Sequence, residues 1–339
     1  GLGPVLDPWT RQAQVAVVAS LDAKGLLVDA HPCYAGIAGT YSQACANAVL
    51  AEADLVIFAG SDTSDQATAS WSLPRPGTRL VQVDLDPLEL GRNYPNTLLV
   101  QADVRTAFEQ LAALGSTADR GAWMATVAQH VDHWREQARG WTGQAGAPIH
   151  PAHLCAQLGE VLPEQAVLVA DTGYASQWAG TLVPLRHVGQ RFLRAAGSLG
   201  WAFPAALGAR CALPETPVVC FTGDGGFMYH AGELETARRW NIKTITVVNN
   251  NSQLAQGVPN IDAVYHGRDA SRKHEIHAFR DMDFARLAQA HDCLGLRVER
   301  PEDFAPAFRE ALSSPLPAVI DVVTDPSARP VSGAPPRAS

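Results

Sequence analysis

The sequence predicts an α/β fold of two doubly wound domains, each built on a mainly parallel sheet. Three observations lead to this prediction. The length of 339 residues suits two domains that each bury a core. Short apolar runs rich in β-branched residues alternate with helical patterns along the whole chain, as in β-α-β units. A Gly/Ala-rich stretch after residue 140 separates the two series, so we expect domains at 1–140 and 148–325 and a flexible tail at 326–339.

In the first domain, apolar runs predict strands and periodic segments predict helices. The expected strands are 15–20, 55–60, 79–86 and 98–103, and the expected helices are 41–53, 104–114 and 123–138. Together the strands predict one modest sheet.

The second domain repeats the alternation with longer apolar strands. Its expected strands are 166–171, 217–222, 244–249, 294–299 and 317–324, and its helices include 228–240, 281–291 and 301–314. The polar, poorly periodic stretch 254–273 predicts a mobile lid. The tail from Pro326 is rich in Pro, Ala, Ser and Arg, which is typical of a disordered segment.

Composition excludes several classes of protein. The chain is 47% hydrophobic and 18% charged, which is ordinary for a soluble protein. A net charge of -8 gives no basic surface for nucleic acid. No apolar run approaches the roughly 18 residues of a membrane span, and the start carries no secretory signal. Six cysteines without a C-x-x-C pair fit a reducing, cytoplasmic location.

The segment Gly223-Asp224-Gly225-Gly226 follows a predicted strand, and the next predicted strand ends in Asn250-Asn251. A strand, a turn, a helix and a parallel strand form one crossover unit, which brings both strand ends to one edge of the sheet. Asp224 and Asn251 are therefore expected to converge. The glycines let a phosphate approach backbone amides at the start of the following helix.

These residues also form a plausible metal site. A carboxylate (Asp224), an amide oxygen (Asn251) and the backbone carbonyl of Gln253 leave octahedral positions on Mg²⁺ for phosphate oxygens and water. The alternative is a simple strand-to-helix turn with Asp224 as a helix cap, and the tetrapeptide alone favours that alternative. The spacing to Asn251 favours the metal site.

The segment from Gly223 to Asn251 resembles the signature of thiamine-diphosphate enzymes, in which Gly-Asp-Gly is followed by Asn-Asn at a strand end. The family's usual spacing selects Asn251 from the triplet Asn249-Asn250-Asn251. The resemblance implies thiamine diphosphate and Mg²⁺ as cofactors, with Asp224, Asn251 and Gln253 on the metal. It further implies that these residues bind the cofactor: Gly223, Asp224, Gly225, Gly226, Phe227, Asn251, Gln253 and Leu254.

Residues 195–209 resemble the family segment that contacts the aminopyrimidine. The resemblance implies that the backbone around Gly197, Ser198 and Leu199 bonds the ring and that Leu199 wedges the cofactor into its bent form. Bending places the 4'-imino nitrogen beside thiazolium C2, where it takes a proton at high effective concentration. Leu199 and Gly197 are therefore the expected catalytic positions in this chain. The alternative for Leu199 is packing on a helix face.

Residues 171–178 resemble the first diphosphate-contacting loop of acetohydroxyacid synthases and benzoylformate decarboxylases. The resemblance implies contacts from Gly173, Tyr174 and Ala175. The synthases usually have Gln-His where this chain has Tyr174-Ala175, so we expect backbone contacts rather than those side chains to be retained.

The first domain resembles the central domain of the same superfamily through residues 22–25, 52–60 and 83–87. Some relatives hold FAD or ADP there. Asp62 follows Gly60-Ser61 where flavin-binding synthases have Arg-Phe-Asp, and the opening strand and glycine turn are not found in the sequence. A flavin is therefore disfavoured.

Two other groups of residues invite functional interpretations. His150, His153 and Cys155 imitate part of a zinc site, but no fourth ligand has a suitable spacing, and His150-Pro151 favours a helix start. Glu233 and Glu235 lie along the expected crossover helix, where packing or solvent exposure is the simpler interpretation.

The resemblance implies carbon–carbon bond chemistry on a 2-keto acid or related carbonyl compound, with an acetolactate-synthase-like carboligation as the first hypothesis. The alternatives are a simple decarboxylase like benzoylformate decarboxylase and a non-catalytic cofactor-binding module. The family's activating glutamate belongs to a pyrimidine-binding domain that these residues do not contain. We therefore expect a partner polypeptide or segment bearing that domain, and a dimer or tetramer.

Overall fold

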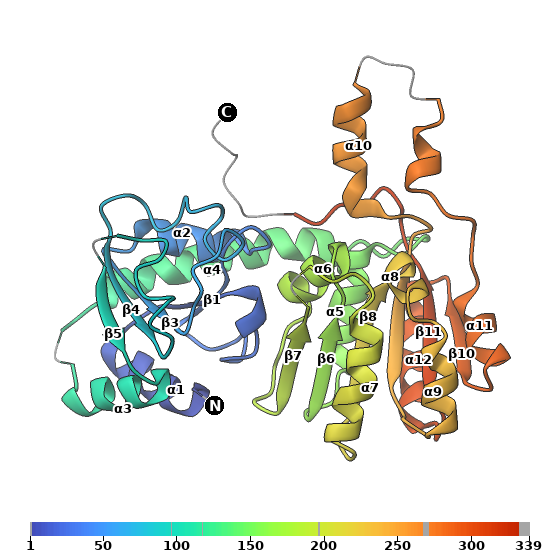
Figure 1. The fold of residues 1–339 in the computed structure, drawn as a ribbon, viewed down its shortest axis with the longest axis horizontal. Helices are drawn as coiled ribbons and strands as arrows, with labels where there is room; N and C mark the ends of the chain where they lie inside the picture. The colour runs from blue at the N-terminus through green and yellow to red at the C-terminus, as the bar shows by residue number, and fades with distance from the viewer. Residues whose placement is uncertain (1, 96, 117, 196, 267–270, 332–339) are drawn as a thin grey trace. The chain divides into compact units, whose positions relative to one another are not determined.

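The structure is a computed structural model that describes residues 2–95, 97–116, 118–195, 197–266 and 271–331 (Figure 1). Contacts divide the chain into two compact units that part between residues 138 and 139. Both units are α/β with parallel strand pairs, as the sequence predicts. None of the helices among the described residues has the length and apolar character that crossing a bilayer requires.

The first unit contains five short strands and several helices. Its elements are α1 (Gly3–Ala13), β1 (Val17–Ala19), the 3-10 turn η1 (Leu21–Ala23), β2 (Tyr34–Ile37), α2 (Ala44–Glu52), β3 (Leu55–Ala59), β4 (Arg79–Asp84), β5 (Leu98–Gln101), α3 (Val104–Leu114) and most of α4 (Gly121–Thr142). Helix α1 and strand β2 are absent from the elements that the sequence predicts.

The single sheet expected for this unit is wrong, because the described strands form two sheets. β1 pairs in parallel with β2, and β3, β4 and β5 form a separate parallel sheet. Strand β2 is interrupted by Gly36 and lacks a β-branched run, yet all four of its residues are buried. Val18 of β1 and Val56 of β3 nevertheless contribute to one hydrophobic cluster.

The division between the units falls inside α4, which continues through residues that the sequence assigns to a linker. Gly140, Trp141 and Thr142 are helical. The irregular stretch therefore begins at Gly143 and ends where Ile149 bridges to Thr324 beside the second sheet. Glycine weakens a helix by about 1 kcal/mol, which tertiary context can override.

The second unit is a six-stranded sheet with helices on both faces. Its elements are α5 (Pro151–Val161), β6 (Ala166–Ala170), α6 (Tyr174–Leu182), β7 (Gln190–Arg194), α7 (Ala202–Ala212), β8 (Val218–Gly223), α8 (Asp224–Met228), α9 (Glu233–Arg239), β9 (Ile245–Asn250), η2 (Ala255–Gly257), α10 (Val258–Tyr265), η3 (Lys273–Ile276), α11 (Phe284–Ala290), β10 (Leu294–Val298), α12 (Pro301–Ser313) and β11 (Ala318–Val323). The strand order is β10-β11-β9-β8-β6-β7, and every pair is parallel.

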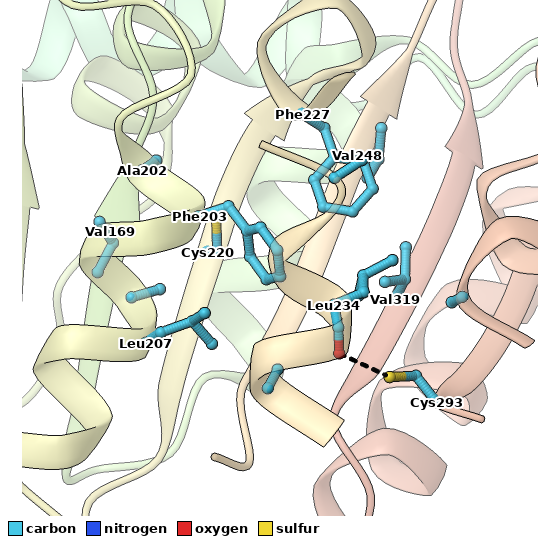
Figure 2. Close-up of a cluster of buried hydrophobic side chains, with 14 of the residues drawn as sticks. Val169, Ala202, Phe203, Leu207, Cys220, Phe227, Leu234, Val248, Cys293 and Val319 are labelled. Carbon is cyan, nitrogen blue, oxygen red and sulfur yellow. Dashed lines mark hydrogen bonds between the residues drawn. The ribbon is translucent and has the colours of Figure 1, made fainter. Parts of the chain in front are cut away.

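One face of this sheet carries α5, α6 and α12, and the other carries α7, α9 and α11. The second face forms a core cluster, in which Figure 2 shows Phe203 and Phe227. Phe203, Phe227 and Phe284 of this cluster are all fully buried. The Phe227 ring lies between the other two, with ring centroids 5.1 Å from Phe203 and 5.7 Å from Phe284. This packing fixes α7, α8 and α11 over the carboxyl half of the sheet.

Three predictions for the second unit need correction. The helix expected over 228–240 is two helices, α8 and α9, because residues 229–232 form a turn. The described residues of the stretch 254–273, expected as a mobile lid, contain η2 and α10, while 267–270 lie outside the described residues; Figure 1 shows α10 projecting beyond the sheet edge. Of the predicted tail, residues 326–331 are described and Ala328 is buried, while 332–339 lie outside the described residues.

Candidate cofactor site

The strand order of the second sheet reverses next to β6. The chain passes from β6 outward to β7 and then returns to place β8 on the other side of β6. The loop after β6 leads to α6 on one face, whereas the segment after β8 leads to α9 on the other. In open α/β sheets, ligands bind in the crevice beyond the carboxyl ends of the strands at such a reversal.

Asp224 lies at this crevice, directly after β8. Its side chain is almost fully buried, with the residue 3% exposed. Oδ1 accepts a hydrogen bond from Gly225 N at 2.7 Å, and Oδ2 accepts one from Gln253 N at 3.1 Å. Burial raises the pKa of Asp224 to about 6, although these backbone donors act in the opposite direction. A buried carboxylate with so few donors is suited to a cation.

Close contacts bring the other predicted segments to the same place. A methyl group on Gly225 would lie 2.6 Å from Leu254 Cδ2, and one on Gly200 would lie 3.1 Å from Gly226 O. A methyl group on Gly173 would lie 3.4 Å from Gln256 Oε1. The predicted first loop, the turn before α7, the Gly-Asp-Gly-Gly segment and the segment after β9 therefore converge.

The three consecutive asparagines have different surroundings. Asn249 and Asn250 are buried within β9. Asn250 Nδ2 donates to Asp321 Oδ1 and to Met282 O, both at 2.9 Å, so this amide is held inside the fold. Asn251 follows the strand and is half-buried. At the strand end, the side chain of Asn250 is therefore bonded inside the fold, whereas Asn251 is the asparagine better placed to bind a ligand.

The segment after Asn251 is held from two sides. Gln253 forms an antiparallel bridge with Ala278; Leu254 N donates to His277 O at 2.8 Å, and Phe279 N donates to Ser252 O at 2.7 Å. The side-chain amide of Gln253 donates to Pro326 O. The backbone at Gln253 is thus fixed beside Asp224 before any ligand binds.

The turn before α7 carries the predicted aminopyrimidine contacts. Gly197 adopts a left-handed φ of +92°, and Gly197 and Ser198 are exposed while Leu199 is half-buried. Gly197 has open space where a side chain would stand. The backbone of this turn is therefore accessible for hydrogen bonding to a ligand.

Two predicted cofactor positions have roles limited by the fold. The Phe227 side chain is fully buried among core aromatic rings, so only its backbone remains available. Tyr174 and Ala175 form the first turn of α6, which Gly173 precedes with φ +88°. Ala175 is buried and Tyr174 is half-buried.

A cavity of about 510 Å³ adjoins Asp224 on the side of α8. Asp224, Gly225 and Asn250 contribute its polar wall, and Met228, Leu254 and Phe279 contribute to its apolar wall. This volume is within the range of small-molecule sites.

The zinc-like histidines have structural partners. His150 caps α5, because its Nδ1 accepts a hydrogen bond from Ala152 N at 3.2 Å, and Pro151 occupies the first helical position as predicted. His153 Nδ1 lies 2.6 Å from Thr142 O. Across the described part of the chain, no group of three or more His, Cys, Asp or Glu is placed to hold a metal.

Glu233 and Glu235 lie in the first turn of α9, away from the strand edge. Glu235 is paired with Arg239 on the surface at 2.9 Å, which fits the solvent-exposed role that the sequence favours.

Two buried carboxylates near the site were not predicted as site residues. Asp171 follows β6 and Asp321 lies within β11, and both are 0% exposed. Asp321 accepts hydrogen bonds from Asn250 Nδ2, Phe284 N and Arg297 Nη1. The sequence does contain a signal for such residues, because an acidic residue within or directly after a strongly apolar strand indicates a buried and hydrogen-bonded carboxylate.

Comparison with known proteins adds the family. Residues 171–322 match the thiamine pyrophosphate enzyme C-terminal TPP binding domain, and residues 5–111 match the thiamine pyrophosphate enzyme central domain. The sequence is 29% identical over 319 residues to "Acetolactate synthase" of Mycobacterium bovis, with 91% of this chain and 51% of the relative covered. It is 27% identical over 325 residues to "Probable acetolactate synthase large subunit" of Methanocaldococcus jannaschii, covering 93% and 54%.

The chain spans about half the length of these curated relatives. The two matched family domains correspond to the two series of elements described above, and the C-terminal match includes Asp171, Asp224 and Asn251. The chain therefore belongs to the superfamily of thiamine-pyrophosphate-dependent enzymes.

Proposed function

We propose that the second unit binds thiamine diphosphate through Mg²⁺ and that the assembled protein performs acetolactate-synthase-like carbon–carbon bond chemistry on a 2-keto acid. The observation that carries the proposal is the hydrogen bond of 3.1 Å from Gln253 N to Asp224 Oδ2. It joins the Gly-Asp-Gly-Gly segment to the segment after β9 at the reversal of the sheet. These are the two segments that the family signature assigns to the metal.

The chemistry of the donor set fits Mg²⁺. The Asp224 carboxylate, the Asn251 amide oxygen and the Gln253 carbonyl are hard oxygen ligands, and such a set leaves room for phosphate oxygens and water. Burial raises the pKa of Asp224 to about 6, because the backbone hydrogen bonds it accepts offset only part of the cost of ionising a buried carboxyl. A divalent cation would offset the rest.

The remaining residues of the site would bind and orient the cofactor. Gly223 to Gly226 offer backbone N–H groups to the diphosphate, and Gly225 lets Leu254 pack closely against them. The backbone at Gly197 and Leu199 would bond the aminopyrimidine, and the Leu199 side chain would support the bent form. When bound, thiamine diphosphate supplies a carbon nucleophile for the substrate carbonyl.

The activating glutamate of the family would come from a pyrimidine-binding domain outside these residues. We propose that this domain completes the site, in a dimer or tetramer. The similarity to acetolactate synthases supports a synthase. With the completed protein and a 2-keto acid, a coupled two-substrate product would support carboligation, whereas free aldehyde alone would favour the decarboxylase.

Binding can be tested on this chain by calorimetric titration with thiamine diphosphate, with and without Mg²⁺. We expect Mg²⁺-dependent binding in the wild type and its loss in Asp224→Ala. Asp103→Ala is the control for loss of an aspartate near a strand end, because Asp103 is exposed, caps α3 by accepting from Thr106 N at 2.9 Å, and lies in the first unit. Wild-type affinity that is absent, or that Asp224→Ala leaves unchanged, would refute the cofactor assignment.

A further inference from the structure

Asp171 is a fully buried carboxylate that the proposed cofactor contacts do not include. It follows β6 directly and precedes the loop at Gly173, and its residue is 0% exposed. Burying a carboxylate is costly unless donors or charges compensate it. Burial raises the pKa of Asp171, while hydrogen bonds from Thr222, Thr172 and Gly200 lower it.

The two oxygens of Asp171 accept hydrogen bonds from three separate segments. Thr172 N donates to Oδ1 at 2.8 Å, and Thr222 Oγ1 donates to Oδ2 at 2.8 Å. Gly200 N donates to both oxygens, at 3.0 Å and 3.1 Å. No lysine, arginine or histidine is among these partners, so the carboxylate is held by neutral donors alone.

Each of the three segments carries proposed cofactor residues. Thr172 precedes the first diphosphate loop, Thr222 precedes the Gly-Asp-Gly-Gly segment, and Gly200 ends the turn that begins at Gly197. Contact with the Gly-Asp-Gly-Gly segment is tight, since a methyl group on Gly226 would lie 2.3 Å from Asp171 Oδ2. The Asp171 carboxylate therefore bonds to three segments that lie within or after different strands of the sheet.

We propose that Asp171 is a positioning residue that holds the aminopyrimidine-binding turn at a fixed place relative to the diphosphate-binding segment. This inference rests on the proposed function. Asp171 itself is not among the residues proposed to contact the cofactor. It acts through Gly200 N on one side and Thr222 Oγ1 on the other.

The geometry of the turn explains why an anchor is needed. Gly197 and Ser198 are exposed, and Gly197 has no neighbour within 4 Å of the position where a side chain would begin. At the other end, Gly200 has a left-handed φ of +90° and its N–H points at the carboxylate. Without Asp171 the turn would lose this fixed end. The diphosphate segment would keep its contact with Gln253 N.

The consequence is a selective loss of affinity for the organic half of the cofactor. The test compares Mg²⁺-pyrophosphate with Mg²⁺-thiamine diphosphate as calorimetric probes of the full chain. In Asp171→Ala we expect affinity for thiamine diphosphate to fall by about tenfold to a hundredfold, the effect of losing hydrogen bonds to a charged group. Affinity for Mg²⁺-pyrophosphate should change by less than about threefold.

Two milder variants keep the test informative if Asp171→Ala does not fold, as judged by near-ultraviolet circular dichroism. Asp171→Asn keeps one oxygen for Gly200 N and should retain most of the preference for thiamine diphosphate. Thr222→Val removes one donor and should reduce the preference several-fold. Thr246→Val is the matched control, because Thr246 is a buried threonine on the adjacent strand whose hydroxyl has no hydrogen-bond partner.

The outcomes separate the inference from the function. If the wild type binds neither probe, the proposed function fails and the inference fails with it. If the wild type binds both and the Asp171 and Thr222 variants weaken both probes equally, Asp171 is a general structural residue and the positioning role is wrong. Unchanged affinity for thiamine diphosphate in Asp171→Ala and Thr222→Val overturns it as well. A fall in the ratio of the two affinities supports it.

Discussion

Replacing Asp224 by asparagine removes a buried negative charge while keeping the shape of the side chain. In the wild type, burial raises the pKa of this carboxyl from 3.8 to about 6. At about 1.4 kcal/mol per pH unit, that difference corresponds to about 3 kcal/mol of lost stability once the group is ionised. The residue is 3% exposed, so solvent provides little screening.

The sign follows from proton binding. Between about pH 4 and pH 6 the folded protein binds more protons at Asp224 than the unfolded chain does, so the free energy of unfolding falls as pH rises. The stability of the protonated Asp224 carboxyl is fully retained below its pKa in the unfolded chain and is lost above its pKa in the folded protein. Between pH 4.5 and pH 7 the wild type should therefore lose about 2 kcal/mol relative to Asp224→Asn.

The assay is urea denaturation of both proteins without divalent cations, over this pH range. The side-chain N–H group of the asparagine would also face one of the backbone N–H donors. This contact lowers the free energy of unfolding by about 1–3 kcal/mol, and the loss is independent of pH. Only the pH-dependent part of the difference tests the argument. A difference in unfolding free energy that stays constant from pH 4.5 to pH 7 would show that Asp224 is not perturbed by burial.

Three further substitutions test the packing around the site by urea denaturation. Gly200→Ala should lower the free energy of unfolding by more than about 1 kcal/mol, because its φ of +90° is left-handed and the new methyl group would lie 2.6 Å from a neighbouring side chain. Gly197→Ala is the control, because Gly197 has a similar φ but open space around it. An equal loss of stability in both variants would refute the clash at Gly200. Phe227→Ala should cost about 3–5 kcal/mol through the cavity left between two aromatic rings, and a cost below 1 kcal/mol would contradict that packing. Asp321→Asn should lower the free energy of unfolding by about 1–3 kcal/mol, because the new amide N–H group would face the N–H donors that now bond to Asp321. An unchanged urea midpoint would show that the hydrogen bond between Asp321 and Asn250 contributes little.

The strands of the second unit were predictable because most are buried on both faces. Residues 166–170 and 217–222 are continuous apolar runs, and β6 and β8 occupy them closely. Strand β7 escaped prediction because it lies at the sheet edge and is a short run in which Gln190, Arg191 and Arg194 flank only two apolar residues. Its pairing with β6 rather than its composition makes it a strand.

The site was predictable in its sequence-local parts only. The spacing between Asp224 and Asn251 follows from one crossover unit, and in the structure Gln253 N, two residues after Asn251, donates to Asp224 Oδ2. The hydrogen bond between Asp171 and Gly200 joins two different strand connections. No local pattern encodes such a contact, since it depends on β6 and β8 being neighbours in the sheet.

The antiparallel bridge between Gln253 and Ala278 closes the base of the excursion that contains α10 and η3 (Figure 1). The two ends of this excursion are bonded to each other, so the backbone beside Asp224 is held where the excursion begins, and Leu254 and Gln256 near its start still contact the site. The entropy of closing a loop grows only with the logarithm of its length, by about 0.6 kcal/mol for each doubling. The part of the excursion that contains α10 and η3 can therefore diverge in length and sequence while the backbone at Gln253 keeps its place.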